Sequence, residues 1–312
     1  MTRETLAHLA MLLMSASVAG SFSLGALAAN EISPVALTAV RFWLAAGVIA
    51  GAAMATTGLP RKAARAPWRY LLLGGLFSIY FVLMFEGLKT ARPVSTSAVF
   101  TLTPVLAAGF GYLLLRQRMT RRIALALAIG AVGALWVIFR ADFAAFLRFE
   151  VGRGEAIFFV GCVAHAFYIP LVRRLNRGEP AIVFTFGTIV AGALVLTLVG
   201  WGELRATEWT ALPGIVWIAL AYLVVFATAL SFVCVQFASL HLPAAKVMAY
   251  TYLIPSWVTL WEIALGHGAP GPLVFAGIGL TVVALVLLLK NEDRPASHRE
   301  THSPETARTH RG

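Results

Sequence analysis

Charged residues are scarce in this chain of 312 residues, because Asp, Glu, Lys and Arg together make up only 12% of it. A soluble domain typically contains about 25% charged residues, and its surface must be largely polar to remain in solution. Hydrophobic residues account for 59% of the sequence. This shortage of charge excludes an ordinary water-soluble enzyme and a disordered protein, and it indicates an integral membrane protein.

The sequence also lacks the motifs of several functional classes. It has no GxxxxGK[ST] phosphate-binding loop, no HExxH zinc motif, no Gly-x-Ser-x-Gly nucleophile turn, and no His/Cys cluster spaced for a metal. We therefore expect neither an ATP-driven pump nor an intramembrane enzyme, and no cofactor or metal. The two cysteines, Cys162 and Cys234, fall within apolar runs and are expected to pack as small apolar groups.

Apolar runs long enough to cross a bilayer make up most of the chain. A spanning helix needs about 20 predominantly apolar residues, and these runs do not alternate in polarity as barrel strands do. Ten spans are predicted, at residues 7–28, 34–56, 68–88, 93–115, 120–139, 154–172, 181–200, 211–240, 243–265 and 269–289. The polar C-terminal segment, residues 290–312, is predicted to be a disordered cytoplasmic tail.

The net charge of +11 would suggest nucleic-acid binding in a soluble protein, but the positions of the charges indicate membrane topology. With ten spans and the N-terminus inside, the inside segments hold nearly three times as many Lys and Arg as the outside segments. This distribution predicts a multi-pass protein of the cell (inner) membrane with both termini in the cytoplasm. The expected partners are the lipid bilayer and a small-molecule substrate, with no nucleic acid.

The N-terminal segment has a second interpretation. Arg3, the apolar run that follows and the small-residue stretch at 26–28 resemble a secretory signal. Cleavage there would leave nine spans and would break the repeat described next, so we expect a retained first span.

The chain divides near residue 145 into two halves with five predicted spans each. The first repeat covers residues 6–139, a linker covers residues 140–153, and the second repeat covers residues 154–289. Because five is an odd number, the second repeat must enter the membrane from the opposite side. Inverted repeats of this kind are typical of secondary transporters, whose site lies near the midplane between the copies. Ancestral duplication without transport is the alternative.

Prolines recur at corresponding places in the two halves. Pro34 and Pro180 open the second and seventh spans, and Pro104 and Pro255 lie within the fourth and ninth. A proline inside a span removes a backbone donor and loosens the helix. Pro104 and Pro255 are therefore candidate hinges or gates for alternating access, and static kinks are the alternative.

Several segments resemble the EamA-type families of the drug/metabolite transporter superfamily. They include ISPVALTAVRFWLAA around Arg41, residues 101–120 and residues 123–138, and their order is similar over about residues 8–289. The resemblance implies ten helices in two inverted five-helix repeats and secondary export or uptake of small metabolites. The sequence departs from the family pattern at His165, at Ile254 and at His267, so the resemblance does not carry over a substrate.

Five ionisable residues within the predicted spans are candidates for a function: Arg41, Glu86, His165, Lys246 and Glu262. A charge in the bilayer costs several kcal/mol, so each needs a partner, water or a function. Arg41 and Lys246 are candidates for binding an anionic substrate group. His165 is a candidate for binding substrate or relaying a proton, and Glu86 and Glu262 are candidates for carrying protons. Each residue also has a structural interpretation. Arg41 and Glu86 could form an ion pair, and His165 could be a hydrogen-bonded core histidine. Lys246 could snorkel to the membrane surface, and Glu262 could lie at the interface.

Four tyrosines lie at depths where they could line a substrate cavity: Tyr80, Tyr168, Tyr250 and Tyr252. All these features predict an all-α secondary active transporter, with export as the expected direction, for small metabolites such as amino acids. Transport would proceed by alternating access, with protons as the candidate coupling ion. The alternative is a non-transport scaffold or signalling protein. Either a monomer or a homodimer is compatible with ten spans.

Overall fold

The computed structural model describes residues 2–60, 63, 65–116, 120–139, 142–148, 151–239, 241 and 249–289, and all regular structure in these ranges is helical. The helices of the first half are α1 (Arg3–Ala28), α2 (Pro34–Thr56), α3 (Trp68–Leu88), α4 (Pro93–Phe100), α5 (Thr103–Leu115) and α6 (Arg121–Ile138). A short helix, α7 (Phe143–Leu147), lies in the linker between the halves. The helices of the second half are α8 (Arg153–Leu175), α9 (Ala181–Val199), α10 (Trp201–Ala206), α11 (Gly214–Val224), η2 (Val225–Leu230), α12 (Ser231–Ser239), η3 (Tyr250–Leu253), α14 (Ile254–Ala264) and α15 (Pro272–Leu289).

Nine helical segments within the described ranges are long and apolar enough to cross a membrane. They correspond to the predicted spans except the ninth, which is described only from residue 249 onward, so the count of ten stays a prediction. Lys246 and the tail at residues 290–312 lie outside the described residues. Large apolar side chains cover the exterior, and Leu198 is 79% exposed. Such a surface fits the lipid bilayer as its solvent.

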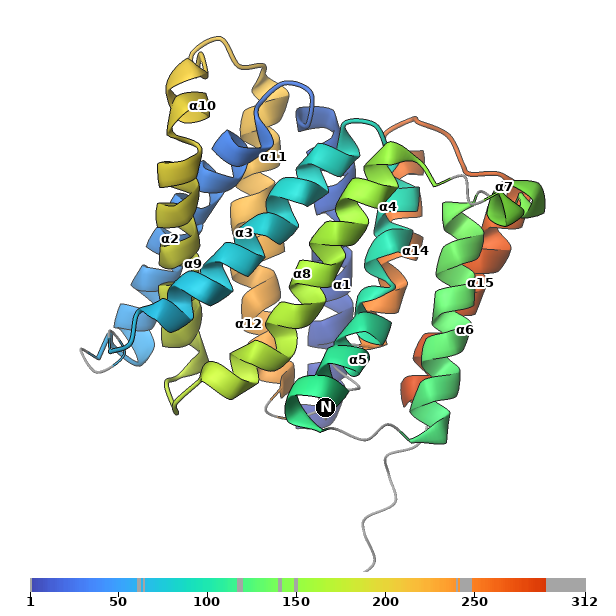
Figure 1. Ribbon diagram of the computed structural model, residues 1–312, viewed down its shortest axis with the longest axis horizontal. Helices are drawn as coiled ribbons and strands as arrows, with labels where there is room; N and C mark the ends of the chain where they lie inside the picture. Colours follow the sequence, from blue (N-terminus) through green and yellow to red (C-terminus); the bar gives the residue numbers. More distant parts are fainter. Residues whose placement is uncertain are drawn as a thin grey trace, which may run out of the picture.

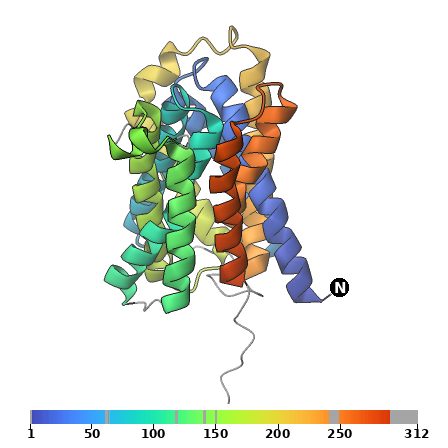
Figure 2. The same ribbon diagram turned by 90° about the vertical axis from the view of Figure 1, so that its right-hand side faces the viewer.

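The two halves run through the bundle in opposite senses. The chain enters α1 at the lower end of the molecule, whereas α8, the first helix of the second half, begins at the upper end (Figure 1). The halves are intermixed, because α3 packs against α8 and α9 while α6 packs against α15, and Figure 2 shows α6 and α15 side by side. The prediction of an all-α membrane protein with two inverted repeats is confirmed.

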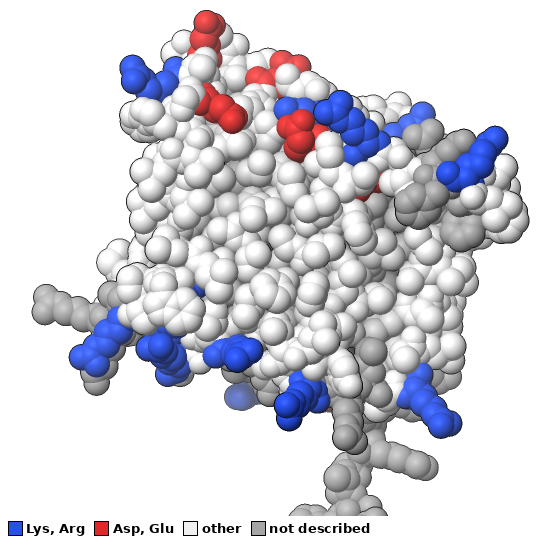
Figure 3. All heavy atoms as spheres, in the orientation of Figure 1, with Lys and Arg blue, Asp and Glu red and all other residues white. Residues whose placement is uncertain are grey.

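Charge gathers at the two ends of the bundle, and the middle is apolar. Figure 3 shows Lys and Arg alone along the lower edge of this view and a mixture of acidic and basic residues along the upper edge. We call the lower end the basic face and define it by Arg3, Arg65, Arg116, Arg121 and Arg177, which begin or follow the helices that meet there. The opposite end, with Glu86, Glu203 and Glu208, is the mixed face.

Pro104 and Pro255 interrupt their helices in the same way. Pro104 lies in the first turn of α5, after a break at Thr101–Leu102 that separates α5 from α4. Pro255 lies in the first turn of α14, directly after the 3₁₀ turn η3. A proline is tolerated in the first turn, where its missing N–H would be unpaired anyway. Each proline therefore restarts a discontinuous helix instead of kinking a continuous one, and its role as a hinge stays a prediction.

Glycines allow the two halves to approach closely where their helices cross. A Cβ atom on Gly74 of α3 would lie 2.5 Å from the backbone nitrogen of Gly192 in α9. A Cβ atom on Gly87, also in α3, would lie 2.6 Å from the carbonyl oxygen of Gly154 in α8. Small residues at helix crossings are a common means of packing within membranes, where van der Waals contact replaces the hydrophobic effect. The interface between the repeats thus depends on backbone-to-backbone contact.

This packing predicts opposite outcomes for two adjacent glycines. Gly74→Ala should lower the free energy of unfolding by about 1–3 kcal/mol, because the added methyl group overpacks the α3–α9 crossing. Gly75→Ala is the matched control, since a Cβ atom there meets nothing within 4 Å, and alanine favours the helix. Unfolding of the purified protein in mixed detergent micelles measures both. Equal stability of the two variants would contradict the close crossing.

Candidate functional site

Arg41 of α2 is buried in the centre of the bundle at 1% exposure. Its Nε and Nη2 atoms donate hydrogen bonds of 3.2 and 3.0 Å to the Thr228 hydroxyl, and its guanidinium lies 3.9 Å from the centre of the Phe81 ring. Among the described residues, its buried Nη1 atom has no hydrogen-bond partner. In the described part of the chain, no carboxylate lies within 4.0 Å of this cation. Arg41 is therefore positioned by neutral groups alone.

The partner of Arg41 lies in a turn of unusual geometry. Residues 225–230 form a π-helical turn, η2, between α11 and α12. The Thr228 hydroxyl donates to the carbonyl oxygen of Leu223 at 2.8 Å, so its oxygen is free to accept from Arg41. Wide turns of this kind occur frequently at functional sites. The contact joins α2 of the first repeat to the second repeat at the middle of the bundle.

Aromatic rings from both repeats surround this centre. Phe77 of α3 is stacked on Tyr168 of α8 with ring centres 5.1 Å apart and meets Phe81 edge-on at 4.8 Å. Tyr80 lies 4.5 Å from the His165 ring, and the Nδ1 atom of His165 is buried without a hydrogen-bond partner. The structure thus brings Arg41, Tyr80, His165 and Tyr168, all predicted from sequence, into one cluster.

A small cavity of about 80 Å³ opens beside this cluster. Phe81 and Thr228, the two contacts of Arg41, form part of its wall. The residues that line it are Phe42, Phe77, Phe81, Tyr168, Thr185, Thr188, Ile189, Ala227, Thr228 and Ser231. They come from both halves of the chain, so the cavity lies where a secondary transporter with inverted repeats holds its substrate.

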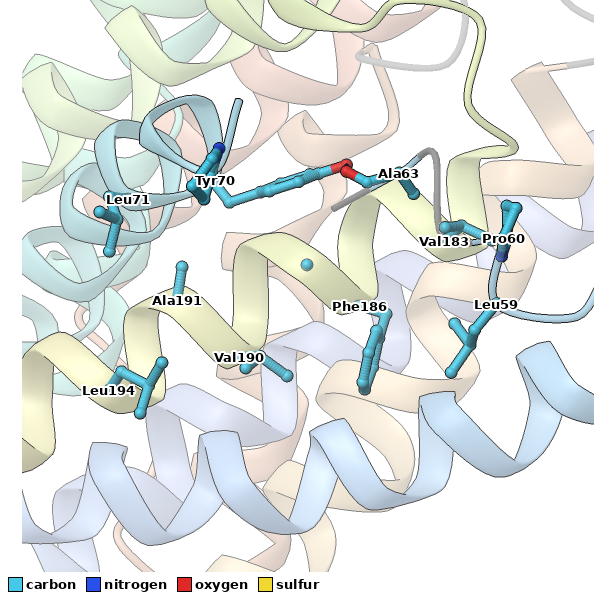
Figure 4. Close-up of a pocket in the computed structure, with 12 residues that line it drawn as sticks. Leu59, Pro60, Ala63, Tyr70, Leu71, Val183, Phe186, Val190, Ala191 and Leu194 are labelled. Carbon is cyan, nitrogen blue, oxygen red and sulfur yellow. The ribbon is translucent and has the colours of Figure 1, made fainter. Parts of the chain in front are cut away.

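A larger pocket of about 500 Å³ lies near the basic face and is almost entirely apolar. Figure 4 shows Leu59, after α2, beside Phe186 of α9, and the Tyr70 ring extending over α9 toward Ala63. The Tyr70 hydroxyl donates to the Ala63 carbonyl at 2.9 Å. The pocket offers a polar metabolite no charged partner, so we place the candidate site at the central cavity.

Two predicted tyrosines pack away from the central cavity. The Tyr250 hydroxyl lies 2.7 Å from Nδ1 of His8, beside the start of α1. Tyr252 is fully buried against α6, where a Cβ atom on Gly130 would lie 2.4 Å from its ring. Its hydroxyl has no hydrogen-bond partner. Their assignment to substrate binding stays a prediction that this arrangement does not favour.

The two predicted acidic residues lie near the mixed face. Glu86 forms an ion pair of 2.7 Å with Lys89, so the alternative pairing of Glu86 with Arg41 is not formed. Glu262 accepts a hydrogen bond from Nδ1 of His267 at 2.9 Å, and its other carboxylate oxygen is buried without a partner. Glu262 and His267, with Arg92, line a pocket of about 330 Å³. Of the two predicted acidic residues, Glu262 is the one that lines this pocket, and its role as a proton carrier stays a prediction.

An ion pair that the sequence analysis missed connects the repeats at the basic face. Arg69 of α3, at 1% exposure, donates to Glu179 at 2.7 Å and to the Leu175 carbonyl at 2.6 Å. The second Glu179 oxygen accepts from the Arg177 backbone N–H at 2.6 Å. The start of α3 is thereby fixed to the turn between α8 and α9. We call the Arg69–Glu179 pair the basic-face latch.

The mixed face has a corresponding connection between the halves. The Ser95 hydroxyl of α4 donates to the Glu155 carboxylate of α8 at 2.8 Å, and Glu155 is 3% exposed. Ser33, which begins α2, donates to Glu203 of α10. Polar contacts between the repeats therefore lie on both sides of the central cavity. No group of three or more His, Cys, Asp or Glu side chains in the described residues is arranged to hold a metal.

Two inverted halves with a buried site between them define a membrane transporter by architecture, and comparison with known proteins identifies the family. The chain matches the model of the EamA-like transporter family over residues 5–139 and 152–290, and it belongs to that family. A curated relative, the uncharacterized transporter YyaM of Bacillus subtilis (strain 168), is 28% identical over 284 residues, covering 90% of this chain and 92% of the relative.

A solved crystal structure shares the fold. Its TM-score is 0.67 at 22% sequence identity, and the match covers 92% of this chain and 96% of the other. The helices of this chain are therefore arranged as in a known fold. The match to the EamA-like transporter family makes the protein a multi-pass membrane transporter.

The basic-face latch predicts a pH-dependent stability. The hydrogen bond from Arg69 lowers the pKa of Glu179 from 4.5 to about 2. A carboxyl with a lowered pKa stabilises the fold above its unfolded-state pKa, and this contribution disappears as the pH falls from about 4.5 to about 2. Glu179→Gln should therefore cost about 1.5–3 kcal/mol at pH 7, and the difference from the wild type should vanish near pH 2.

Thermal unfolding in detergent across this pH range measures the effect. Glu208→Gln, on an exposed residue after α10, is the matched control and should follow the wild type throughout. A difference between Glu179→Gln and the wild type that does not depend on pH would contradict the ion pair.

Proposed function

We propose that this protein is a secondary active transporter that exports small carboxylate-bearing metabolites, such as amino acids, by alternating access. The observation that supports this most directly is Arg41. Its buried guanidinium has a donor without a partner, and it lies beside a cavity at the interface of two inverted repeats. A fixed cation in that position attracts a substrate carboxylate.

Alternating access requires the site to be closed on one side at a time. The basic-face latch closes the repeat interface below the cavity, and the Ser95–Glu155 contact joins the repeats on the mixed face. Each connection consists of a few short polar contacts, so one connection can break while the other stays formed. The discontinuous helices α4–α5 and η3–α14 are the proposed hinges, because their backbone is already interrupted at Pro104 and Pro255.

Protons are the proposed coupling ion, and Glu262 is the favoured carrier. Its unpartnered carboxylate oxygen is buried beside a pocket near the mixed face. His165 provides a second proton acceptor at the central site. In the proposed orientation, both termini are in the cytoplasm and the basic face is the cytoplasmic face of the cell membrane, in agreement with the positive-inside rule.

Proton movement in liposomes that contain the purified protein tests this function. A pH-sensitive dye is read while pools of amino acids, organic acids, sugars and nucleosides are added in turn. We expect one carboxylate-bearing pool to move protons, because the proposed transport exchanges the solute for protons. Glu262→Gln should reduce this movement to background, whereas Glu208→Gln, on the exposed loop, should retain it.

The outcomes separate the parts of the proposal. Solute crossing without proton movement would contradict the coupling but support transport. Failure of every solute pool to cross, with protein shown to be folded by its unfolding transition, would contradict the transport function.

A further inference from the structure

The central site has an unbalanced positive charge. Among the described residues, Arg41 contacts neutral groups only: it donates to the Thr228 hydroxyl and lies against the face of the Phe81 ring. Its Nη1 atom has no hydrogen-bond partner there. A buried charge without a counter-charge is costly, and the cost falls when a hydrogen-bonded ion of opposite sign arrives. A bound carboxylate supplies that ion.

Five residues with hydroxyl groups line the cavity, and three of these hydroxyls already donate to backbone carbonyls. Thr188 donates to the Phe184 carbonyl at 2.9 Å, Thr228 to the Leu223 carbonyl at 2.8 Å, and Ser231 to the Ala227 carbonyl at 2.8 Å. Arg41 is the charged donor beside this cavity, and a charged donor binds a carboxylate more strongly than a neutral hydroxyl does. The carboxylate of a ligand is expected to bind there and not among the hydroxyls.

The remaining wall favours a flat apolar group. Phe77 and Tyr168 are stacked nearly parallel, at an interplanar angle of 20°, and both line the cavity with Phe42, Phe81 and Ile189. Ring faces of this kind stack on planar groups and attract little polar solvent. None of the side chains that line the cavity is acidic, so a ligand ammonium group would lie near Arg41 without a carboxylate to offset it.

Phe81 separates the cavity from the cation. Its ring lines the cavity and also covers the Arg41 guanidinium at 3.9 Å. The volume of about 80 Å³ is well below the roughly 150 Å³ of an apolar cavity that binds benzene. A ligand must therefore displace part of the wall, and displacement of Phe81 both enlarges the cavity and uncovers Arg41.

We propose that the substrate is an organic monoanion, a carboxylate that carries an aromatic or similarly flat apolar group and does not need an amino group. The carboxylate pairs with Arg41 after Phe81 moves aside, and the flat group stacks against Phe77 and Tyr168. This inference rests on the proposed transport function and narrows its substrate class from small metabolites in general to apolar carboxylates.

Three probes that share a phenyl ring and differ in charge test the proposal by isothermal titration calorimetry on the purified protein in nanodiscs. They are 3-phenylpropionate, which is an anion, phenylalanine, which is a zwitterion, and phenethylamine, which is a cation. We expect 3-phenylpropionate to bind at least about 10-fold more tightly than phenylalanine, and phenethylamine not to bind, because of the uncompensated charge on Arg41.

Variants of Arg41 then assign the charge. Arg41→Gln should weaken the binding of 3-phenylpropionate at least about 10-fold, Arg41→Lys should retain part of it, and Arg153→Gln, on an exposed residue at the start of α8, should leave it unchanged. The ranking of the three probes is measured on the wild type, so it does not depend on the folding of any variant.

Several results would overturn the proposal. These are binding of phenylalanine as tight as that of 3-phenylpropionate, saturable binding of phenethylamine, or binding of none of the probes. In each case, solute flux in the liposome experiment would show that the transport function still stands, whereas absence of flux from folded protein would show that it has failed as well.

Discussion

The structure is organised around one buried charge, the Arg41 guanidinium at the interface of the two repeats. A cation within the membrane is tolerated only with partners, water or a ligand. Arg41 has a ring face and one hydroxyl as partners, and one donor remains unpaired. This incomplete solvation suits the proposed binding site, and it differs from a structural ion pair, in which the charge would already be neutralised.

The local backbone geometry positions the hydrogen-bond acceptor and the rings that surround Arg41. The π-helical turn η2 presents the Thr228 oxygen to Arg41 while the same hydroxyl satisfies the Leu223 carbonyl. The glycine crossings bring α3 close to α8 and α9, so that Phe77 and Phe81 of α3 reach the rings of the second half. Backbone geometry, packing and electrostatics therefore meet at the same place, where the two repeats share a cavity.

Local patterns in the sequence predict much of this arrangement. Apolar runs define the spans, their odd number per half defines the inversion, and the cost of burying charge identifies Arg41, His165 and Glu262 from residue type and depth. The rotation of a side chain about its helix is not encoded in depth. Tyr250 and Tyr252 lie at suitable depths, yet one contacts α1 and the other packs against α6.

Residues that act through tertiary contact escaped the sequence analysis for the same reason. Arg69 resembles the basic residues of the loop before α3, and only the fold shows that it meets Glu179, which is more than a hundred positions away in the chain. Thr228 lies in an apolar run with no sign of a π-helical turn. The phenylalanines Phe77 and Phe81 resemble lipid-facing residues until α8 is placed beside them.

The central claim is that the basic-face latch closes the pathway to the cavity beside Arg41. The most direct measurement is the rate at which a membrane-impermeant maleimide, applied from the basic face, labels a cysteine at position 185. Thr185 lies in the cavity wall, so the variant is Thr185→Cys. Cys162 and Cys234 are replaced by alanine, so that only the introduced cysteine reacts. We predict slow labelling of this cysteine while Glu179 is present and much faster labelling in Glu179→Gln. Equal labelling rates in the two proteins would show that the latch does not control access to the site.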